Sequence, residues 1–234
     1  MNYLQLVQRL WLECGVSGAS PGPATVIGQT GESQRLVTWI DAAWHDDIQT
    51  AHKDWGWMRT SASFTTVLNQ AIYPLGTGAG TVGVPVASFG MWARDTGRSY
   101  NTAAGTNSER FIDYVPYDAW RNAYQFGAVR NSPSWPLQFS IAPDKSICLG
   151  PVALDGYTFT FDYFTAPTHL AADTDVPALP EGYHMALVYK AMMMYGAFEG
   201  ATEVYDRGEL EFGKLMQRMD ADRLPEVLFG GALA

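Results

Sequence analysis

Residues 30–67 read TGESQRLVTWIDAAWHDDIQTAHKDWGWMRTSASFTTV, and the hydrophobic period changes within this stretch. The first part spaces its apolar side chains as one face of an α-helix of about six turns. Thr30 is the expected N-cap, and Glu32 lies in the first turn. That face comprises Leu36, Ile40, Ala43, Trp44, Ile48, Ala51 and Trp55. From Trp57 onward the period is two, which predicts that the chain passes from a helical part into a β part.

Helices are also predicted at both ends of the chain. Residues 2–15 form an amphipathic pattern that stops at Gly15, a C-cap glycine. After a proline-rich link that ends near residue 180, two more helices follow, with Gly200 as the turn between them. The expected apolar face of the first is His184, Leu187, Val188, Ala191, Tyr195 and Phe198, and that of the second is Val204, Gly208, Phe212, Leu215 and Met219.

The middle of the chain has the alternation and the turn signals of a mainly antiparallel β region. Strands are predicted in WMRTSASFTTV (57–67), SFGMWAR (88–94), RFIDYVPY (110–117), PLQFSIA (136–142), SICLGPV (146–152) and YTFTFDYF (157–164), with a short helix that begins at Tyr117 or Asp118. The predicted fold is α+β. Residues 1–56 and 180–225 form a helical body, residues 57–179 are an inserted β region, and residues 226–234 are an apolar C-terminal arm.

Composition narrows the function. Of 234 residues, 47% are hydrophobic and only 17% are charged, which suggests that part of the surface is covered by other subunits. The net charge is −9, and no cluster of Lys and Arg is present, so a repressor, polymerase or nuclease is disfavoured. An acidic wall past which DNA slides is compatible with this charge. No signal peptide and no apolar run of membrane-spanning length is found.

Residues 76–85, GTGAGTVGVP, contain a literal G-x-G-x-x-G at Gly78, Gly80 and Gly83. A dinucleotide site requires a helix directly after the third glycine, and Pro85 forbids a helix interior there. We therefore expect no cofactor, and we interpret the segment as a mobile loop tip on a surface that faces a partner.

The remaining polar clusters predict no metal and no catalytic residue. His45, Asp46, Asp47 and His52 lack metal-ligand spacing, and we expect them on a polar helix face. Asp173 and Asp175 supply too few ligands for calcium, and His169, His184 and Ser17 lie in no catalytic motif. Cys14 and Cys148 are expected to be free thiols in a reducing cytoplasm.

Two apolar segments indicate assembly. Met192, Met193 and Met194 make one helix apolar all round, so we expect one side to pack in its own subunit and the other to face a neighbouring copy. The arm carries Val227, Leu228 and Phe229 beside two glycines, a sequence that gains more by ordering in a partner's groove than on its own domain.

The order of these elements resembles the tailed-phage head-to-tail adaptor proteins, which include the tail tubular proteins beneath the portal ring. Four stretches carry the resemblance: TGE (30–32) with the long helix ending in HKDWGWMR (52–59), RFIDYVPYDAWRNAY (110–124), residues 132–184 from SPSWPLQFSIA to EGYH, and the helix pair of residues 187–226. They cover nearly the full chain and specify architecture, with no catalytic site.

The resemblance implies a structural virion protein, not an enzyme, made in the cytoplasm of the bacterial host. Its copies would form a homo-oligomeric ring, usually twelvefold, that docks on the portal protein and presents a platform to the next tail or nozzle protein. DNA would pass through the lumen with transient, non-specific contacts, and the C-terminal arm would insert between portal subunits.

An alternative from another class is a β-sandwich that binds or cleaves carbohydrate. Trp92, Tyr100, Trp120 and Trp135 look exposed, and flat rings stack on sugars. Glu109, Asp113 and Asp118 could supply the pair of carboxylates that glycoside hydrolysis needs.

Overall fold

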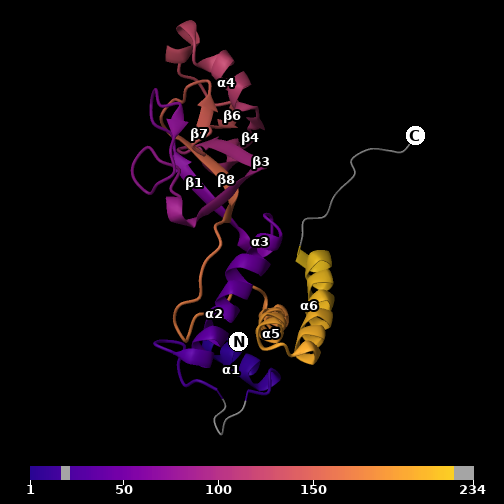
Figure 1. The fold of residues 1–234 in the computed structure, drawn as a ribbon. Helices are drawn as coiled ribbons and strands as arrows, with labels where there is room; N and C mark the ends of the chain where they lie inside the picture. Colours follow the sequence, from indigo (N-terminus) through magenta and orange to yellow (C-terminus); the bar gives the residue numbers. More distant parts are fainter. Residues whose placement is uncertain (17–21, 224–234) are drawn as a thin grey trace, which may run out of the picture. The chain divides into compact units, whose positions relative to one another are not determined.

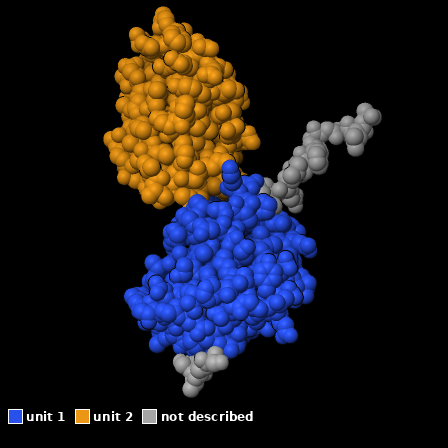
Figure 2. All heavy atoms as spheres, viewed as in Figure 1, with its two compact units in different colours: residues 1–58, 167–234 blue, residues 59–166 orange. Residues whose placement is uncertain are grey.

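The computed structural model describes residues 1–16 and 22–223, and the chain divides into two compact units (Figures 1 and 2). Residues 1–58 and 167–234 form the helical unit, and residues 59–166 form the β unit. The chain leaves the helical unit after Met58 and returns at Pro167. The predicted α+β class is confirmed.

Local chemistry sets the two ends of α1 and the end of α5, whereas Thr30 occupies the expected N-cap position of α2 without a side-chain hydrogen bond. The first helix opens with a capping box, in which the Asn2 side chain accepts from the Gln5 amide and the Gln5 side chain accepts from Asn2. Gly15 and Gly200 have φ of +64° and +68°, the left-handed conformation that ends a helix. The elements are α1 (Tyr3–Glu13), α2 (Gly31–Ala42), η1 (Ala43–Ile48), α3 (Gln49–Ala51), η2 (Gly56–Met58), η6 (Glu181–Tyr183), α5 (Met185–Glu199) and α6 (Thr202–Arg223).

The long second helix is one continuous rod with a π-helical segment, η1, in its middle. Hydrogen bonds to the fifth residue add a residue to the turn and shift the phase of the face that follows. As a result Ala51, expected in the apolar face, is exposed, while Gln49 turns inward and is buried. The helix ends at Ala51, yet Trp55 is still fully buried because its Nε1 donates to the Ile48 carbonyl at 2.8 Å.

Helix α5 is the centre of the helical unit. It packs on α1, α2 and η1 on one side and along its length on α6 on the other. A helix that is covered all round can be apolar all round. Packing of α5 against α6 of the same chain accounts for the burial of Met192, whereas Met193 and Met194 stay partly exposed. Met192 is fully buried, and a Cβ built on Gly208 of α6 would lie 3.2 Å from the Met192 Cβ and 3.1 Å from the Met193 Cγ.

The β unit consists of two four-stranded sheets, with strand orders β1-β8-β3-β4 and β2-β7-β6-β5. All pairs are antiparallel except β5 with β6. The strands are β1 (Arg59–Thr65), β2 (Ile72–Tyr73), β3 (Phe89–Asn101), β4 (Arg110–Phe111), β5 (Asp113–Tyr114), β6 (Gln138–Ile141), β7 (Ile147–Gly150) and β8 (Tyr157–Thr165), with η3 (Val86–Ser88), η4 (Gly105–Ser108), α4 (Tyr117–Tyr124) and η5 (Gly127–Asn131) between them. The short helix and the strands predicted within 57–67, 88–94, 136–142, 146–152 and 157–164 are confirmed. The strand predicted at 110–117 is instead two short strands, β4 and β5, in different sheets, and β2 was not predicted.

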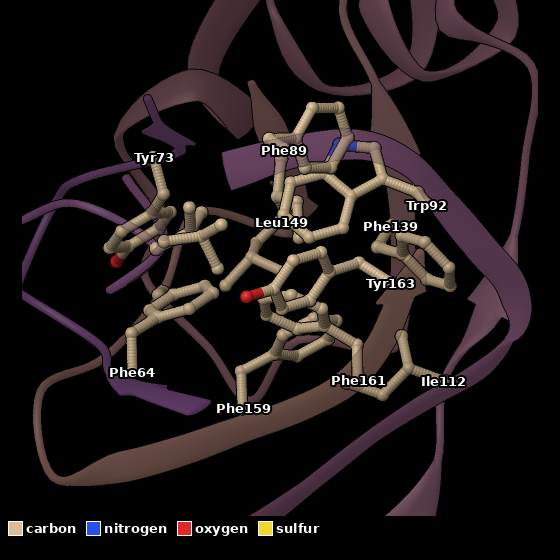
Figure 3. Packing of buried hydrophobic residues seen from close by; sticks show 14 residues of the cluster. Phe64, Tyr73, Phe89, Trp92, Ile112, Phe139, Leu149, Phe159, Phe161 and Tyr163 are labelled. Atoms are coloured by element: carbon tan, nitrogen blue, oxygen red, sulfur yellow. The ribbon is translucent and has the colours of Figure 1, made fainter. Parts of the chain in front are cut away.

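An aromatic core fills the space between the sheets (Figure 3). Phe159 lies at its centre, with ring centroids 5.4 Å from Phe64 and 5.7 Å from Phe139 of the other sheet. The predicted alternation of β8 is correct for Phe159 and Phe161, which point inward. Its other face is more buried than expected, because β1 and β3 pair along both sides of β8 and their side chains cover it.

The glycine-rich segment is an ordered hairpin on this core, not a projecting tip. Gly76 and Val84 form an antiparallel bridge, and the Thr81 hydroxyl donates to the carbonyls of Gly76 and Gly78, 2.7 Å from each. Val82 and Val84 are fully buried. The sequence expectation of a mobile tip is therefore wrong, because alternate valines of the segment are part of the β core.

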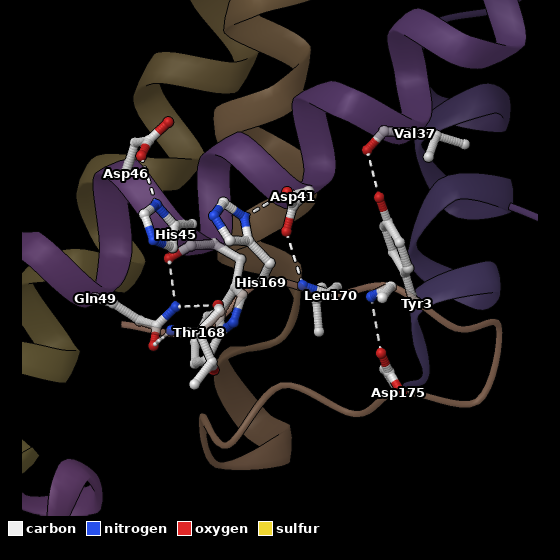
Figure 4. A network of polar contacts seen from close by, with 12 residues as sticks. Tyr3, Val37, Asp41, His45, Asp46, Gln49, Thr168, His169, Leu170 and Asp175 are labelled. Carbon is white, nitrogen blue, oxygen red and sulfur yellow. Dashed lines mark hydrogen bonds and ion pairs between the residues drawn. The ribbon is translucent and has the colours of Figure 1, made fainter. Parts of the chain in front are cut away.

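Residues 167–176, called the strap here, follow β8 in the chain and lead toward α5. Polar contacts hold the strap to the helical unit (Figure 4). The Gln49 side chain pairs with the Thr168 backbone in both directions, and Asp41 accepts from the Leu170 amide and from His169. The rings of His45 and His169 are stacked with centroids 3.8 Å apart. The sequence analysis extended the β region to residue 179, whereas these contacts place residues 167–179 in the helical unit.

Candidate functional site

The polar residues considered for a metal have separate partners. His45 Nδ1 lies 2.6 Å from Asp46, Asp47 accepts from Lys190 at 2.9 Å, and His52 lies 3.1 Å from Asp220 of α6. Within residues 1–16 and 22–223, no group of three or more His, Cys, Asp or Glu side chains could hold a metal ion. Their contacts connect η1 with α5, His52 with α6, and His45 with His169 of the strap.

Asp173 and Asp175 are also structural. Asp173 accepts from the Thr25 hydroxyl and from the Val26 amide, at 3.0 Å and 2.6 Å. Asp175 accepts from the amides of Ala172 and Ala171, which lowers the pKa of its carboxyl. Each carboxylate thus has its own backbone partners, and the two belong to no group of three or more possible metal ligands among the described residues.

The two cysteines are free and buried, Cys14 in the helical unit and Cys148 in the β unit. Burial raises the pKa of each thiol to about 12, with a smaller contribution from a nearby carboxylate. A thiol in this state is a poor nucleophile at neutral pH, so neither cysteine has the chemistry of a catalytic residue.

The aromatic residues that motivated the carbohydrate alternative do not form an exposed row. Trp92 and Trp120 are buried, contrary to the sequence expectation, and Trp92 donates its Nε1–H to the Lys145 carbonyl at 2.7 Å. Trp135 is partly buried beneath Arg110, whose guanidinium lies 4.1 Å from its ring. The face of Trp135 that a sugar would stack on is therefore already occupied by a cation.

The helix pair provides a firm base for the predicted C-terminal arm. In the last turns of α6, Met219 is fully buried, Asp220 pairs with His52, and Asp222 accepts a hydrogen bond from the Tyr183 hydroxyl. At the other end of α6, Arg207 pairs with Glu13 of α1 at 2.6 Å. The predicted arm residues Val227, Leu228 and Phe229 lie outside the described residues.

The three methionines predicted to lie at an interface differ in how much of their surface is exposed. Met192 has no exposed surface, so it cannot contact a partner in this conformation, whereas Met193 and Met194 are half-buried. The sequence analysis missed a better candidate nearby. Phe198 was assigned to the buried face of α5 but is 57% exposed, flanked by Trp39 at 5.7 Å between centroids and by the Arg35 guanidinium at 4.6 Å. Aromatic and Arg side chains on a surface are typical of protein interfaces.

The two units differ in net charge. The helical unit contains 8 Lys and Arg against 17 Asp and Glu, which is the whole net charge of −9. The β unit contains 7 of each and is neutral. No signal in the helix and strand pattern indicates this division, which becomes visible only when the boundaries of the units are known.

A model of the SU10 adaptor protein family matches residues 1–227. The chain belongs to this family. The match spans both units, so the helical ends and the inserted β unit belong to one architecture. Membership makes the chain a phage head-to-tail adaptor, a structural component of the virion that interacts with other head and tail proteins. No curated protein matches this adaptor. Among the described residues of the adaptor, no helix is both long and apolar enough to cross a membrane.

Proposed function

We propose that copies of this adaptor form a ring beneath the phage portal, that the ring links capsid to tail, and that DNA passes through its lumen. The family resemblance implies a twelvefold ring. The chain would be made in the host cytoplasm and incorporated at the head–tail interface, where it acts as a structural protein without catalytic residues, metal or cofactor.

The charge division carries this proposal. The helical unit has a net charge of −9, and DNA is a dense polyanion. A lumen wall built from this unit would repel phosphate groups and would hold passing DNA only through transient, non-specific contacts. The neutral β unit would not repel DNA in this way. We assign it to contacts with proteins, including the next tail or nozzle protein.

The C-terminal arm, residues 226–234, is the proposed portal contact. Its apolar residues Val227, Leu228 and Phe229 would insert into a groove of the portal. The root of the arm is well suited to this role, because Met219, Asp220 and Asp222 fix the last turns of α6 to the helical unit. A fixed root reduces the conformational entropy that ordering the arm costs. Met193 and Met194, with Phe198, are proposed as secondary contacts between copies.

Deleting residues 226–234 tests the proposal. The truncated protein should keep its helical circular dichroism and its thermal transition but should no longer sediment with portal-bearing capsids. The matched control deletes only residues 231–234, leaves Val227 to Phe229 in place and should still attach. Negative-stain images of the attached wild-type protein should show a closed ring. Normal attachment of the 226–234 deletion would refute the assignment of the arm, and absence of any ring on the capsids would refute the proposed function.

A further inference from the structure

Thirty-four consecutive residues, from Thr60 to Ala93, contain no Asp, Glu, Lys, Arg or His. At the average charged content of this chain, 17%, a stretch of this length would hold about six charged residues. Charged side chains are depleted from the cores of protein interfaces, where each would have to be desolvated. The stretch is therefore unusual for a surface that meets only water.

Much of this stretch is on the surface, along one lateral side of the β unit. Its strand β1 is an edge of one sheet, and its strand β2 is an edge of the other. The rings of Phe64 and Tyr73, with centroids 4.4 Å apart, join these two edges. The opposite edges are β4 and β5, which are separated in sequence by Ile112 alone. The β unit thus has two different sides, an uncharged β1–β2 side and a β4–β5 side.

Strand β1, the longer of the two edges on the β1–β2 side, lacks the protection that free sheet edges usually have. Natural edge strands avoid pairing with other chains through charges, prolines or bulges. The opposite edge strand of the same sheet, β4, has such protection, since it is only two residues long and one of them is Arg110. Strand β1 is seven residues long, mostly exposed, and uncharged after Arg59. Unprotected edges of this length are normally covered.

A shallow apolar cleft of about 370 Å³ adjoins this edge, between β1 and the glycine-rich hairpin. None of the ten residues that line it is ionisable. On the hairpin side the lining includes Gly78, Ala79 and Gly80, so backbone rather than long side chains forms the rim. Val67, which lines the cleft, and Leu68, the next residue along the chain, are 43% and 48% exposed. The cleft fits an uncharged apolar segment that approaches the backbone closely.

We propose that the β1–β2 side is covered in the assembled ring by the β4–β5 side of a second copy. The proposal rests on the proposed ring function and names the surfaces that build it. The β4–β5 side offers exposed apolar groups that could pack against the cleft: Phe111 is 68% exposed, with the Arg98 guanidinium 4.6 Å from its ring, and Leu137 is 56% exposed. Leu137 is joined to this side because its carbonyl accepts from the Asp113 amide. Two unlike surfaces on one chain meet in a heterologous contact, the type of contact that builds a ring when the rotation between successive copies closes.

A photo-cross-linking amino acid at position 68 tests the contact in capsids that carry the portal and the adaptor. The expected product is an adaptor dimer in which residue 68 is joined to residues 110–137 of another copy. Cross-links from position 68 only to the portal or to a tail protein would overturn the proposal. So would the absence of any cross-link in assembled particles.

The pair Leu68→Glu and Leu68→Gln separates burial of charge from loss of side-chain shape, since the two new side chains have almost the same size. A charge buried in this contact without a partner should reduce the number of adaptor copies per capsid about tenfold or more, and the glutamine variant should attach far better. Equal attachment of the glutamate variant and wild type refutes the contact. Because wild-type attachment is scored in the same assay, failure of this contact with a wild-type ring intact leaves the proposed function standing. Failure of the wild type to attach is a failure of the function itself, and the contact is then judged by cross-links between purified copies.

Discussion

The helical unit and the β unit are of similar size but use opposite chemistry at their surfaces and in their anchoring. The helical unit carries the entire net charge and all four histidines, and its strap and α6 are fixed by ion pairs and buried polar contacts. The β unit is neutral and is held by a core of packed aromatic rings. The difference teaches that net charge is a statement about a unit's surface and its partners rather than about its fold.

The largest expected effect tests whether the two units unfold independently. Replacing Phe159 by Ala removes the ring at the centre of the β core and leaves a cavity among Phe64, Phe139 and Phe161. The β unit should lose about 3–5 kcal/mol in free energy of unfolding. In denaturant titrations followed by NMR, the native amide signals of residues 59–166 should be lost at lower denaturant concentration, while those of α1, α2 and α5 should keep their own midpoint.

Phe126→Ala is the matched control for this variant, because Phe126 is 54% exposed and its truncation should change stability by less than about 1 kcal/mol. If Phe159→Ala shifts both transitions by the same amount, the two units unfold as one, and the comparison between them must be restricted to their surfaces.

The next prediction tests the packing of α5 on α6. It uses two glycines of α6 that have different surroundings. A Cβ on Gly208 would lie 2.8 Å from the Tyr189 carbonyl oxygen and would force α5 and α6 apart. Gly208→Ala should therefore destabilise the helical unit by about 1–3 kcal/mol despite its better helix propensity. A Cβ on Gly213 would meet nothing within 4 Å, so Gly213→Ala should stabilise by up to about 1 kcal/mol. Thermal melts followed at 222 nm would show the two opposite signs. Two shifts of the same sign would contradict the packing of α5 on α6.

Sequence periodicity was sufficient to predict the helices and strands because their local signals agree with their surroundings. Gly15 and Gly200 end helices by a conformation that glycine adopts at little cost, and the alternation at 157–164 is that of a strand with one face in a core. The π-helical segment at 43–48 could not be predicted, since its cause is tertiary: it turns Gln49 inward to bind the Thr168 backbone of the strap.

The candidate interfaces were harder to predict, because a sequence does not say which apolar side chains are already covered. Of the three methionines expected at an interface, Met192 is covered within its own chain while Met193 and Met194 stay partly exposed, and Phe198, expected in the core, is exposed near the end of α5. The uncharged stretch from Thr60 to Ala93 is visible in the sequence alone. Its meaning required the sheet order, which shows that β1 and β2 are both edges.

The smallest effect uses pH to address the helical unit alone, through His184. Burial lowers the pKa of this imidazole, which is fully enclosed, with Nε2 donating to the Leu179 carbonyl at 2.8 Å and Nδ1 lying 2.7 Å from the amino group of Met1. The nearby amino group lowers the pKa further, and Glu181 opposes this. Since the folded state keeps the ring neutral, the unfolded state binds the extra proton as the pH falls below about 6.5. The stability of the helical unit should therefore be complete above that pH and should decline below it, by at most about 1.4 kcal/mol per pH unit.

In His184→Gln this part of the slope should disappear, whereas His52→Gln, which leaves His184 in place, should retain it. The β unit has no histidine, so its transition should not change between pH 7.5 and 6. An unchanged slope in His184→Gln would show that the proton is taken up elsewhere. A β transition that moved in parallel would show instead that the pH response is not confined to the helical unit.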